Sequence, residues 1–200
     1  MKHFRARLRA GFTLIEVLIT VSLLSLVGAN VYMVLADSSK AYESQTIAAD
    51  TELQVRRTLD RIALAIMGSS RETLWTVEEA PFSAHALNFE SNLGMQDGVP
   101  VWSEPQQIAM INEGSRKVAW FENPDFENER KVIWNKYVAE FSAGEIPNGI
   151  DDNGNGLTDE LGLSFALNGN SVTIRLTLQR QGADGNWVTR ELATTVTCRN

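Results

Sequence analysis

The sequence predicts an α+β fold in which one long N-terminal helix packs on an antiparallel β-sheet domain. No proline occurs between Phe12 and Ala80, so nothing in this stretch forces a helix to end. Residues 12–36 are apolar on all sides, whereas residues 37–67 carry apolar side chains on one side only. After Ser70 the helical period gives way to short apolar runs separated by turn residues. A helix followed by such strands is an α+β layer arrangement.

Residues 12–36 form the first part of the predicted helix and include one formal charge, Glu16. As a helix they span roughly 37 Å, which is enough to cross a bilayer once. Four basic residues and no acidic residue precede this stretch: Lys2, Arg5, Arg7 and Arg9. The positive-inside rule therefore predicts a cytoplasmic N-terminus and an exported C-terminal part. An ordinary secretory signal has a shorter apolar core, with its small-residue cleavage site after that core.

The junction before the apolar stretch reads Gly11-Phe12-Thr13-Leu14-Ile15-Glu16-Val17-Leu18. It resembles the class III signal of type IV pilins and type II secretion pseudopilins. The resemblance implies that a prepilin peptidase cleaves after Gly11, that Phe12 is then N-methylated, and that Glu16 is the acidic fifth residue of the processed chain. It also implies a bacterial inner-membrane protein with a periplasmic domain, which later joins a pilus or pseudopilus. A plain signal-anchor explains the basic flank but neither Glu16 nor the Gly11–Phe12 junction.

Glu16 is destabilised when it is unpaired in a bilayer. Next to the positive N-terminus of a neighbouring subunit it gains a partner in a medium of low dielectric constant, where the attraction is strong. The resemblance implies that this pair guides the subunit from the membrane into a filament. The alternative is a carboxylate that faces the lipid headgroups near the start of the helix.

The size and charge of the chain limit what its exported part can be. The chain has 200 residues, 44% of them hydrophobic, and a net charge of −7. We expect a leader (1–11), a membrane or filament-core helix (12–36), an amphipathic helix (37–70) and a β-rich domain (71–200). Loss of the leader, with its four basic side chains, would leave a net charge of −11, so nucleic acid is not an expected partner. The chain's one cysteine, Cys198, excludes an intrachain disulfide.

The second half of the predicted helix carries an apolar stripe. Val55, Leu59, Ile62 and Ile66 recur at helical spacing, and we expect the stripe to be buried against a sheet. On the polar side, Glu52 and Arg56 are placed to form an ion pair at i, i+4. Gly68, Ser69 and Ser70 are expected to end the helix.

Short β-like runs follow at 74–77, 86–89, 107–111, 117–121 and 132–138. We expect turns between them at 92–94, 97–98 and 122–124. The clearest strand is 172–178, in which Val172, Ile174, Leu176 and Leu178 alternate with polar residues. A turn at 182–186 and a second strand at 187–197 complete a predicted hairpin with one buried face. Its intervening threonine and arginine residues are expected to face solvent.

The second motif is an acidic, glycine-rich loop at residues 148–160. From Asp151 it reads Asp-x-Asn-x-Asn-Gly, in which side-chain oxygens at positions 1, 3 and 5 can converge on Ca²⁺. The candidate ligands are Asp151, Asn153, Asn155, the Leu157 main-chain carbonyl, and Asp159 or Glu160. Position 12 is Gly162 and no helices are expected on either side, so this is not a helix-loop-helix calcium hand. The alternative is a solvated turn without a metal.

The acidic loop, Leu176-Thr177-Leu178 and the closing residues 195–200 resemble J-type minor pseudopilins and W-type minor pilins. The resemblance implies a structural subunit of a type II secretion pseudopilus or a type IV pilus. The resemblance also implies assembly with other minor and major subunits at the filament tip. The alternative is a filament-tip adhesin or substrate-binding module, which exposed aromatic residues between 92 and 105 would favour.

The sequence contains no motif that predicts an enzyme. His85 is the one histidine after the leader, and a catalytic triad or a zinc site needs more partners than a lone histidine. The five tryptophans could form a sugar-binding platform, but we expect them to anchor the core of a small domain. They are Trp75, Trp102, Trp120, Trp134 and Trp187.

Overall fold

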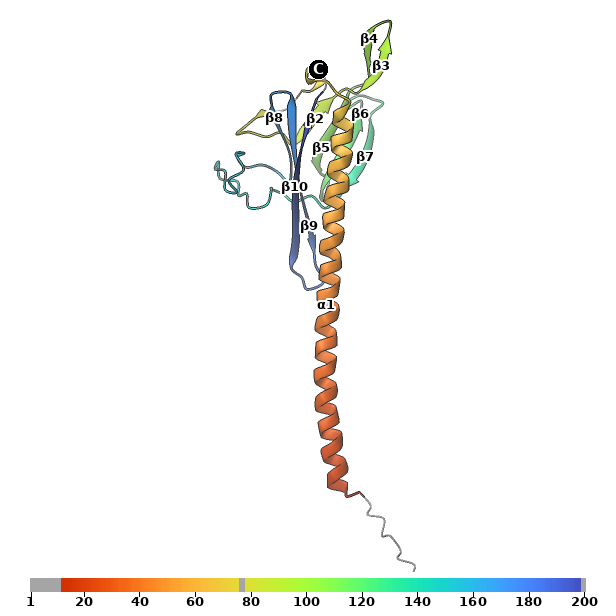
Figure 1. The fold of residues 1–200 in the computed structure, drawn as a ribbon, viewed down its shortest axis with the longest axis vertical. Helices are drawn as coiled ribbons and strands as arrows, with labels where there is room; N and C mark the ends of the chain where they lie inside the picture. Colours follow the sequence, from red (N-terminus) through yellow and green to blue (C-terminus); the bar gives the residue numbers. More distant parts are fainter. Residues whose placement is uncertain (1–11, 76–77, 199–200) are drawn as a thin grey trace, which may run out of the picture. The chain divides into compact units, whose positions relative to one another are not determined.

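The structure is a computed structural model that describes residues 12–75 and 78–198. The chain divides into two compact units, residues 1–43 and 44–200. Helix α1 (Leu14–Met67) continues for 54 residues and contributes to both units. Figure 1 shows α1 followed along the chain by the strands. The long helix and its end at Gly68 are therefore confirmed.

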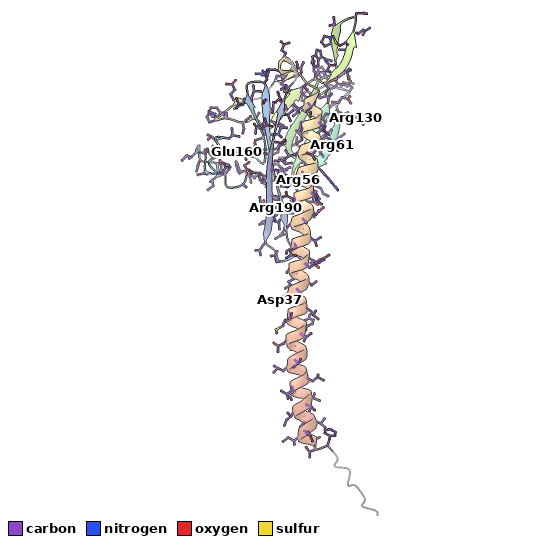
Figure 2. The ribbon with its side chains drawn as sticks, viewed as in Figure 1. Asp37, Arg56, Arg61, Arg130, Glu160 and Arg190 are labelled. Carbon is purple, nitrogen blue, oxygen red and sulfur yellow. The ribbon has the colours of Figure 1, made fainter. Side chains whose placement is uncertain are left out.

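In the first unit, α1 exposes its large apolar side chains. Leu14, Leu18, Leu24 and Leu35 are all more than half exposed, and Figure 2 shows side chains projecting around the helix. The most apolar 18-residue window of α1 has a mean hydropathy of 2.0, and none of it is buried. A helix this long and apolar can cross a membrane. The first unit therefore fits a membrane anchor.

The second unit contains ten strands among the described residues. The first five are β1 (Glu78–Glu79), β2 (Ala86–Phe89), β3 (Asn92–Gln96), β4 (Val99–Trp102) and β5 (Gln106–Asn112). The others are β6 (Arg116–Glu122), β7 (Arg130–Asn135), β8 (Leu163–Asn168), β9 (Ser171–Gln181) and β10 (Trp187–Thr197). One sheet has the order β1-β8-β9-β10, a second has the order β2-β5-β6-β7, and β3 and β4 form a separate hairpin. All these pairs are antiparallel except β1 with β8.

The core of the second unit joins the helix to both sheets. The predicted stripe on α1 is buried, with Val55, Ile62 and Ile66 at 0% exposure. It belongs to one cluster with the inward face of β9 and with residues of the second sheet such as Leu87 and Ile108. The predicted face of β9 is fully buried: Val172, Ile174, Leu176 and Leu178. The apolar patterns of the helix and the C-terminal hairpin were therefore sufficient to predict this packing.

Polar contacts accompany this packing. The Asn135 side-chain amide donates to the Thr58 hydroxyl at 3.1 Å, inside the core. Arg180 on β9 pairs with Asp50 on α1. The predicted pair of Glu52 with Arg56 is confirmed, with a distance of 2.7 Å from Oε1 to Nη2.

Several strand predictions are corrected. Residues 92–94, expected to be a turn, begin β3, and the hairpin turns at Asp97 and Gly98, whose φ angles are +53° and +80°. The strand expected at 132–138 is β7, which ends at Asn135. The run expected at 74–77 contributes an isolated bridge from Trp75, and residues 76–77 lie outside the described residues. The sequence did not predict β8, because it is buried on both faces and does not alternate.

The prediction that the tryptophans anchor the core is only partly right. Trp120 and Trp134 stack at 6.5 Å between ring centroids and pack against the core cluster. Trp187 is 62% exposed and Trp75 is 40% exposed, so neither is a core anchor. Cys198 is buried in the core, and burial raises the pKa of its thiol.

Candidate functional site

The start of α1 places Glu16 in a helix cap. The Glu16 main-chain N–H donates to the Thr13 hydroxyl at 3.3 Å, and the Val17 N–H donates to the Thr13 carbonyl at 3.2 Å. Thr13 is therefore the N-cap, and Glu16 lies at the third helical position, where a glutamate is favoured. Phe12 is 81% exposed just before the cap, and Gly11 lies outside the described residues.

The acidic loop closes at its base on the first sheet. Phe141 forms a bridge with Leu161, and the Ser142 N–H donates to the Glu160 carbonyl at 3.0 Å. A Cβ atom at Gly162 would lie 2.2 Å from the Ala139 carbonyl oxygen. Only glycine fits this close approach, so position 12 of the calcium-like motif has no room for a side-chain ligand.

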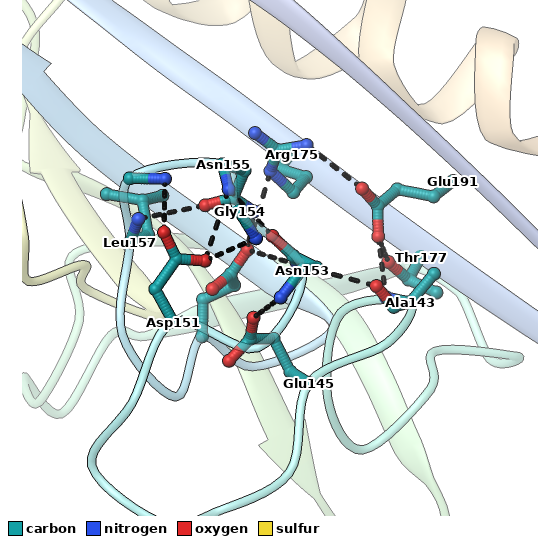
Figure 3. Close-up of polar contacts among 12 residues, drawn as sticks. Ala143, Glu145, Asp151, Asn153, Gly154, Asn155, Leu157, Arg175, Thr177 and Glu191 are labelled. Carbon is teal, nitrogen blue, oxygen red and sulfur yellow. Dashed lines mark hydrogen bonds and ion pairs between the residues drawn. The ribbon is translucent and has the colours of Figure 1, made fainter.

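Within the loop, the motif residues hold a tight turn through their side-chain oxygens. The Asp151 carboxylate accepts hydrogen bonds from the N–H groups of Gly154 (2.7 Å), Asn155 (3.1 Å) and Gly156 (2.8 Å). Asn153 Oδ1 accepts from the Asn155 N–H at 3.0 Å. Figure 3 shows Asp151, Asn153 and Asn155 gathered on one side of this turn. Gly156, at position 6, has a φ of +88°, as the sharp turn requires.

Position 7 continues the same pattern. The Leu157 N–H donates to Asn155 Oδ1 at 2.9 Å. The Leu157 side chain is buried, which fixes this end of the turn against the protein. Position 5 is thus linked to positions 1, 3 and 7 by hydrogen bonds between side chain and main chain.

Two buried glutamates face this turn. Glu160 is 1% exposed, and its Oε1 accepts from the side-chain amides of Asn153, at 3.2 Å, and Asn155. Glu145 is 8% exposed, and its Oε1 accepts from the Asn153 main-chain N–H at 3.1 Å. The Oε2 atoms of both glutamates are buried and have no hydrogen-bond partner among the described residues.

Burial raises the pKa of Glu145. The N–H groups of Asn153 and Asp159 oppose this shift, while the negative charges of Glu160 and Asp151 add to it. Glu160 and Asp151 therefore lie close enough to Glu145 to disfavour the charged form of its carboxyl group.

Asp159 and Glu160 are adjacent in sequence but contact different parts of the loop. Its carboxylate accepts from the main-chain N–H groups of Asn148, at 2.9 Å, and Gly149, at 2.9 Å to Oδ2. It therefore holds the entrance of the loop, whereas Glu160 lies with Asn153 and Asn155 next to the sheet (Figure 2). Of the two alternative ligands expected from the sequence, the structure brings Glu160 into the turn.

The expectation that the arginine and threonine residues of the hairpin face solvent is corrected at Thr177 and Arg175, which are covered on the outer face of β9. Other residues of the hairpin, such as Arg190 and Thr195, are exposed as expected. Thr177 is fully buried and donates to Glu191 Oε2 at 2.8 Å. Arg175 lies 2.9 Å from Glu191 Oε1 and 3.7 Å from Glu160 Oε1. The N–H of Ala143, five residues before the loop, also donates to Glu191, at 2.6 Å. Figure 3 shows this network between the loop and the strands.

The sequence analysis therefore missed Glu145, Arg175, Thr177 and Glu191. The last three belong to alternating strands, where a polar residue normally indicates the solvent face. Glu145 lies six residues before the motif begins. The available signal was the pair of acidic residues, Glu140 and Glu145, between the predicted strand 132–138 and the loop.

The network predicts how acid affects the second unit. Burial alone would raise the pKa of Glu191, but the Ala143 N–H, the Thr177 hydroxyl and the Arg175 guanidinium together lower it below its ordinary 4.5. Stability from this group is therefore present above pH 4.5 and is lost as the pH falls through the lowered pKa. We expect the unfolding free energy of the wild type to fall more between pH 6 and pH 3 than that of Glu191→Gln. Equal losses in urea titrations at the two pH values would contradict this.

The chemistry of the loop limits what it can hold. Among the described residues, no three His, Cys, Asp or Glu side chains form a metal-binding group on their own. A cation at this turn would therefore need amide and main-chain oxygens as well as carboxylates. Such an all-oxygen set suits Ca²⁺ and does not suit Zn²⁺.

Comparison with known families gives one match. The family described as the prokaryotic N-terminal methylation motif matches residues 6–29, which include the Gly11–Phe12 junction, Glu16 and the first turns of α1. No curated protein and no solved structure matched the chain.

Proposed function

We infer from these findings that the chain, a type IV pilin-like protein with a class III signal, is a minor pseudopilin or minor pilin. It is a structural subunit and not an enzyme. A prepilin peptidase removes residues 1–11, Phe12 is N-methylated, and the processed subunit assembles with other minor and major subunits at the filament tip.

One observation carries this proposal: the methylation motif lies at the start of a helix whose apolar side chains are exposed. Exposed apolar surface of this extent is unfavourable in water and needs a bilayer or other helices around it. A subunit that moves from the inner membrane into a helical filament provides both surroundings in turn. Glu16 then exchanges an unpaired state in the membrane for a pair with a neighbour's N-terminus.

The assignment as a minor subunit rests on the resemblance of the acidic loop and the C-terminal hairpin to J-type and W-type subunits. These two features are in contact: Glu160 of the loop lies 3.7 Å from Arg175 on β9 of the hairpin. The pseudopilus and the pilus are both compatible with this assignment.

A tip adhesin or substrate-binding module is the alternative. It would be favoured by exposed aromatic residues between 92 and 105. The one aromatic residue in that range, Trp102, is half-buried. The exposed large apolar side chains of the β3–β4 hairpin are Leu93, Met95 and Val99, none of them aromatic. This hairpin therefore lacks the aromatic surface that the alternative needs.

Co-purification tests the proposed assembly. The full chain, tagged at its C-terminus and produced in a bacterium with a secretion pseudopilus or type IV pilus, is crosslinked in intact cells and isolated. We expect other minor subunits among the crosslinked proteins, because the exposed helix needs helical neighbours.

A strain without prepilin peptidase provides the control, since the unprocessed chain should remain in the membrane without these partners. Crosslinks to pilin subunits that do not depend on the peptidase would contradict the proposal. So would a processed chain that crosslinks to none of them.

A further inference from the structure

The acidic loop lacks one ligand that its motif calls for. In a helix-loop-helix calcium site, position 12 supplies a bidentate glutamate. Here that position is Gly162, and the 2.2 Å approach of a Cβ atom to the Ala139 carbonyl oxygen excludes any side chain. Residues 151–157 nevertheless form the tight turn that such sites use. The missing carboxylate must come from another part of the chain if the turn holds a cation.

Glu145 lies where that carboxylate is needed. Its Oε1 accepts the N–H of Asn153, which is position 3 of the motif, at 3.1 Å. Its Oε2 is buried without a hydrogen-bond partner among the described residues. We propose that Glu145 replaces the absent position-12 ligand and, together with Glu160, completes a Ca²⁺ site on the 151–157 turn.

Glu160 provides a second and independent indication of a bound cation. It is 1% exposed, its Oε2 has no hydrogen-bond partner among the described residues, and its Oε1 meets the amides of Asn153 and Asn155. A buried carboxylate oxygen without a partner is strongly unfavourable. A divalent cation between Glu145 and Glu160 satisfies both orphan oxygens and offsets the mutual repulsion of these groups with Asp151.

The available donors select the cation. Carboxylates of Glu145, Asp151 and Glu160 are joined by amide oxygens of Asn153 and Asn155 and by the main-chain carbonyl at Leu157. All are oxygen donors, and six or more are available, as Ca²⁺ prefers. Mg²⁺ needs a near-ideal octahedron at shorter distances and retains several waters, so it fits this crowded turn less well.

The site has a structural consequence. Glu160 lies 3.7 Å from the Nε of Arg175, whose Nη1 pairs with Glu191, and Glu191 accepts the N–H of Ala143, five residues before the loop. A cation bound by Glu145 and Glu160 therefore fixes the loop on the outer face of β9. The inference takes one element from the proposed function, the export of the second unit. Export places the loop in a compartment where Ca²⁺ is plentiful.

A Ca²⁺ titration of the full chain in detergent, after EDTA treatment, tests the site. We expect calorimetry to show one bound Ca²⁺ per chain and tryptophan fluorescence to show a thermal midpoint about 5 °C higher with Ca²⁺. Glu145→Gln should bind at least about tenfold more weakly. The control, Asp152→Asn, removes one exposed charge from the same loop and should change the affinity by less than about twofold.

A second measurement separates ligand loss from misfolding. In EDTA, Glu145→Gln should unfold at the same temperature as the wild type or higher, because it removes a buried charge that has no cation beside it. The inference is overturned if the wild type shows no Ca²⁺ response, if Glu145→Gln responds like the wild type, or if Asp152→Asn weakens binding as much as Glu145→Gln. A chain that binds Ca²⁺ but is never processed would contradict the proposed function alone.

Discussion

Glu16→Gln is expected to abolish incorporation into the filament while the subunit still reaches the membrane. Glutamine keeps the shape of the side chain and can still take part in the helix cap, but it cannot pair with a positive N-terminus. In a medium of low dielectric constant, loss of one charge leaves its partner uncompensated, which costs about 3 kcal/mol or more. Glu16→Asp retains the charge and should retain assembly. The measurement is crosslinking to sibling subunits in intact cells.

Thr13→Ala is the matched control for Glu16. It removes the hydroxyl that accepts the Glu16 N–H and weakens the start of α1 by about 1 kcal/mol, but it leaves the carboxylate in place. We expect Thr13→Ala to assemble. If it fails as completely as Glu16→Gln, Glu16 acts through the helix cap and the pairing account is wrong.

Gly162→Ala is expected to have the largest effect in the second unit. Its Cβ would lie 2.2 Å from the Ala139 carbonyl oxygen, so the backbone at the base of the loop must separate. We expect a loss of about 3 kcal/mol and a thermal midpoint lower by about 5–10 °C.

Gly68→Ala provides the comparison, because its Cβ would meet only the Ser91 side chain at an ordinary 3.8 Å. It should leave the thermal midpoint nearly unchanged. Equal effects of the two substitutions would show that close packing at Gly162 does not hold the loop base. Gly162→Ala should also weaken the Ca²⁺ response, because it displaces the loop on which Glu145 and Glu160 depend.

The predictable parts of the fold share one physical property, which is that each buries a single face. The α1 stripe at Val55, Ile62 and Ile66 and the alternation along β9 both report such a face in the sequence. Strand β8 is buried on both faces, so its sequence does not alternate between apolar and polar residues. The β3–β4 hairpin is largely exposed, so its strands show no alternation either.

Only part of the candidate site at the acidic loop could be predicted from the sequence. The motif from Asp151 to Leu157 could be found because its candidate ligands are close in sequence. Glu145 could not be found, because its role depends on the path of the loop between it and the turn. Arg175 and Thr177 were assigned to solvent because the residues that cover them come from the segment 143–160, about 15–35 residues away in the sequence. Tertiary packing, not local pattern, decided their burial.

Mass spectrometry of the N-terminal peptide of the full chain, purified from a host with an active prepilin peptidase, tests the central claim most directly. The account predicts that the chain begins at Phe12 with an added N-methyl group and lacks residues 1–11. A chain that still begins at Met1, or that is cleaved after the apolar stretch instead of after Gly11, would contradict it.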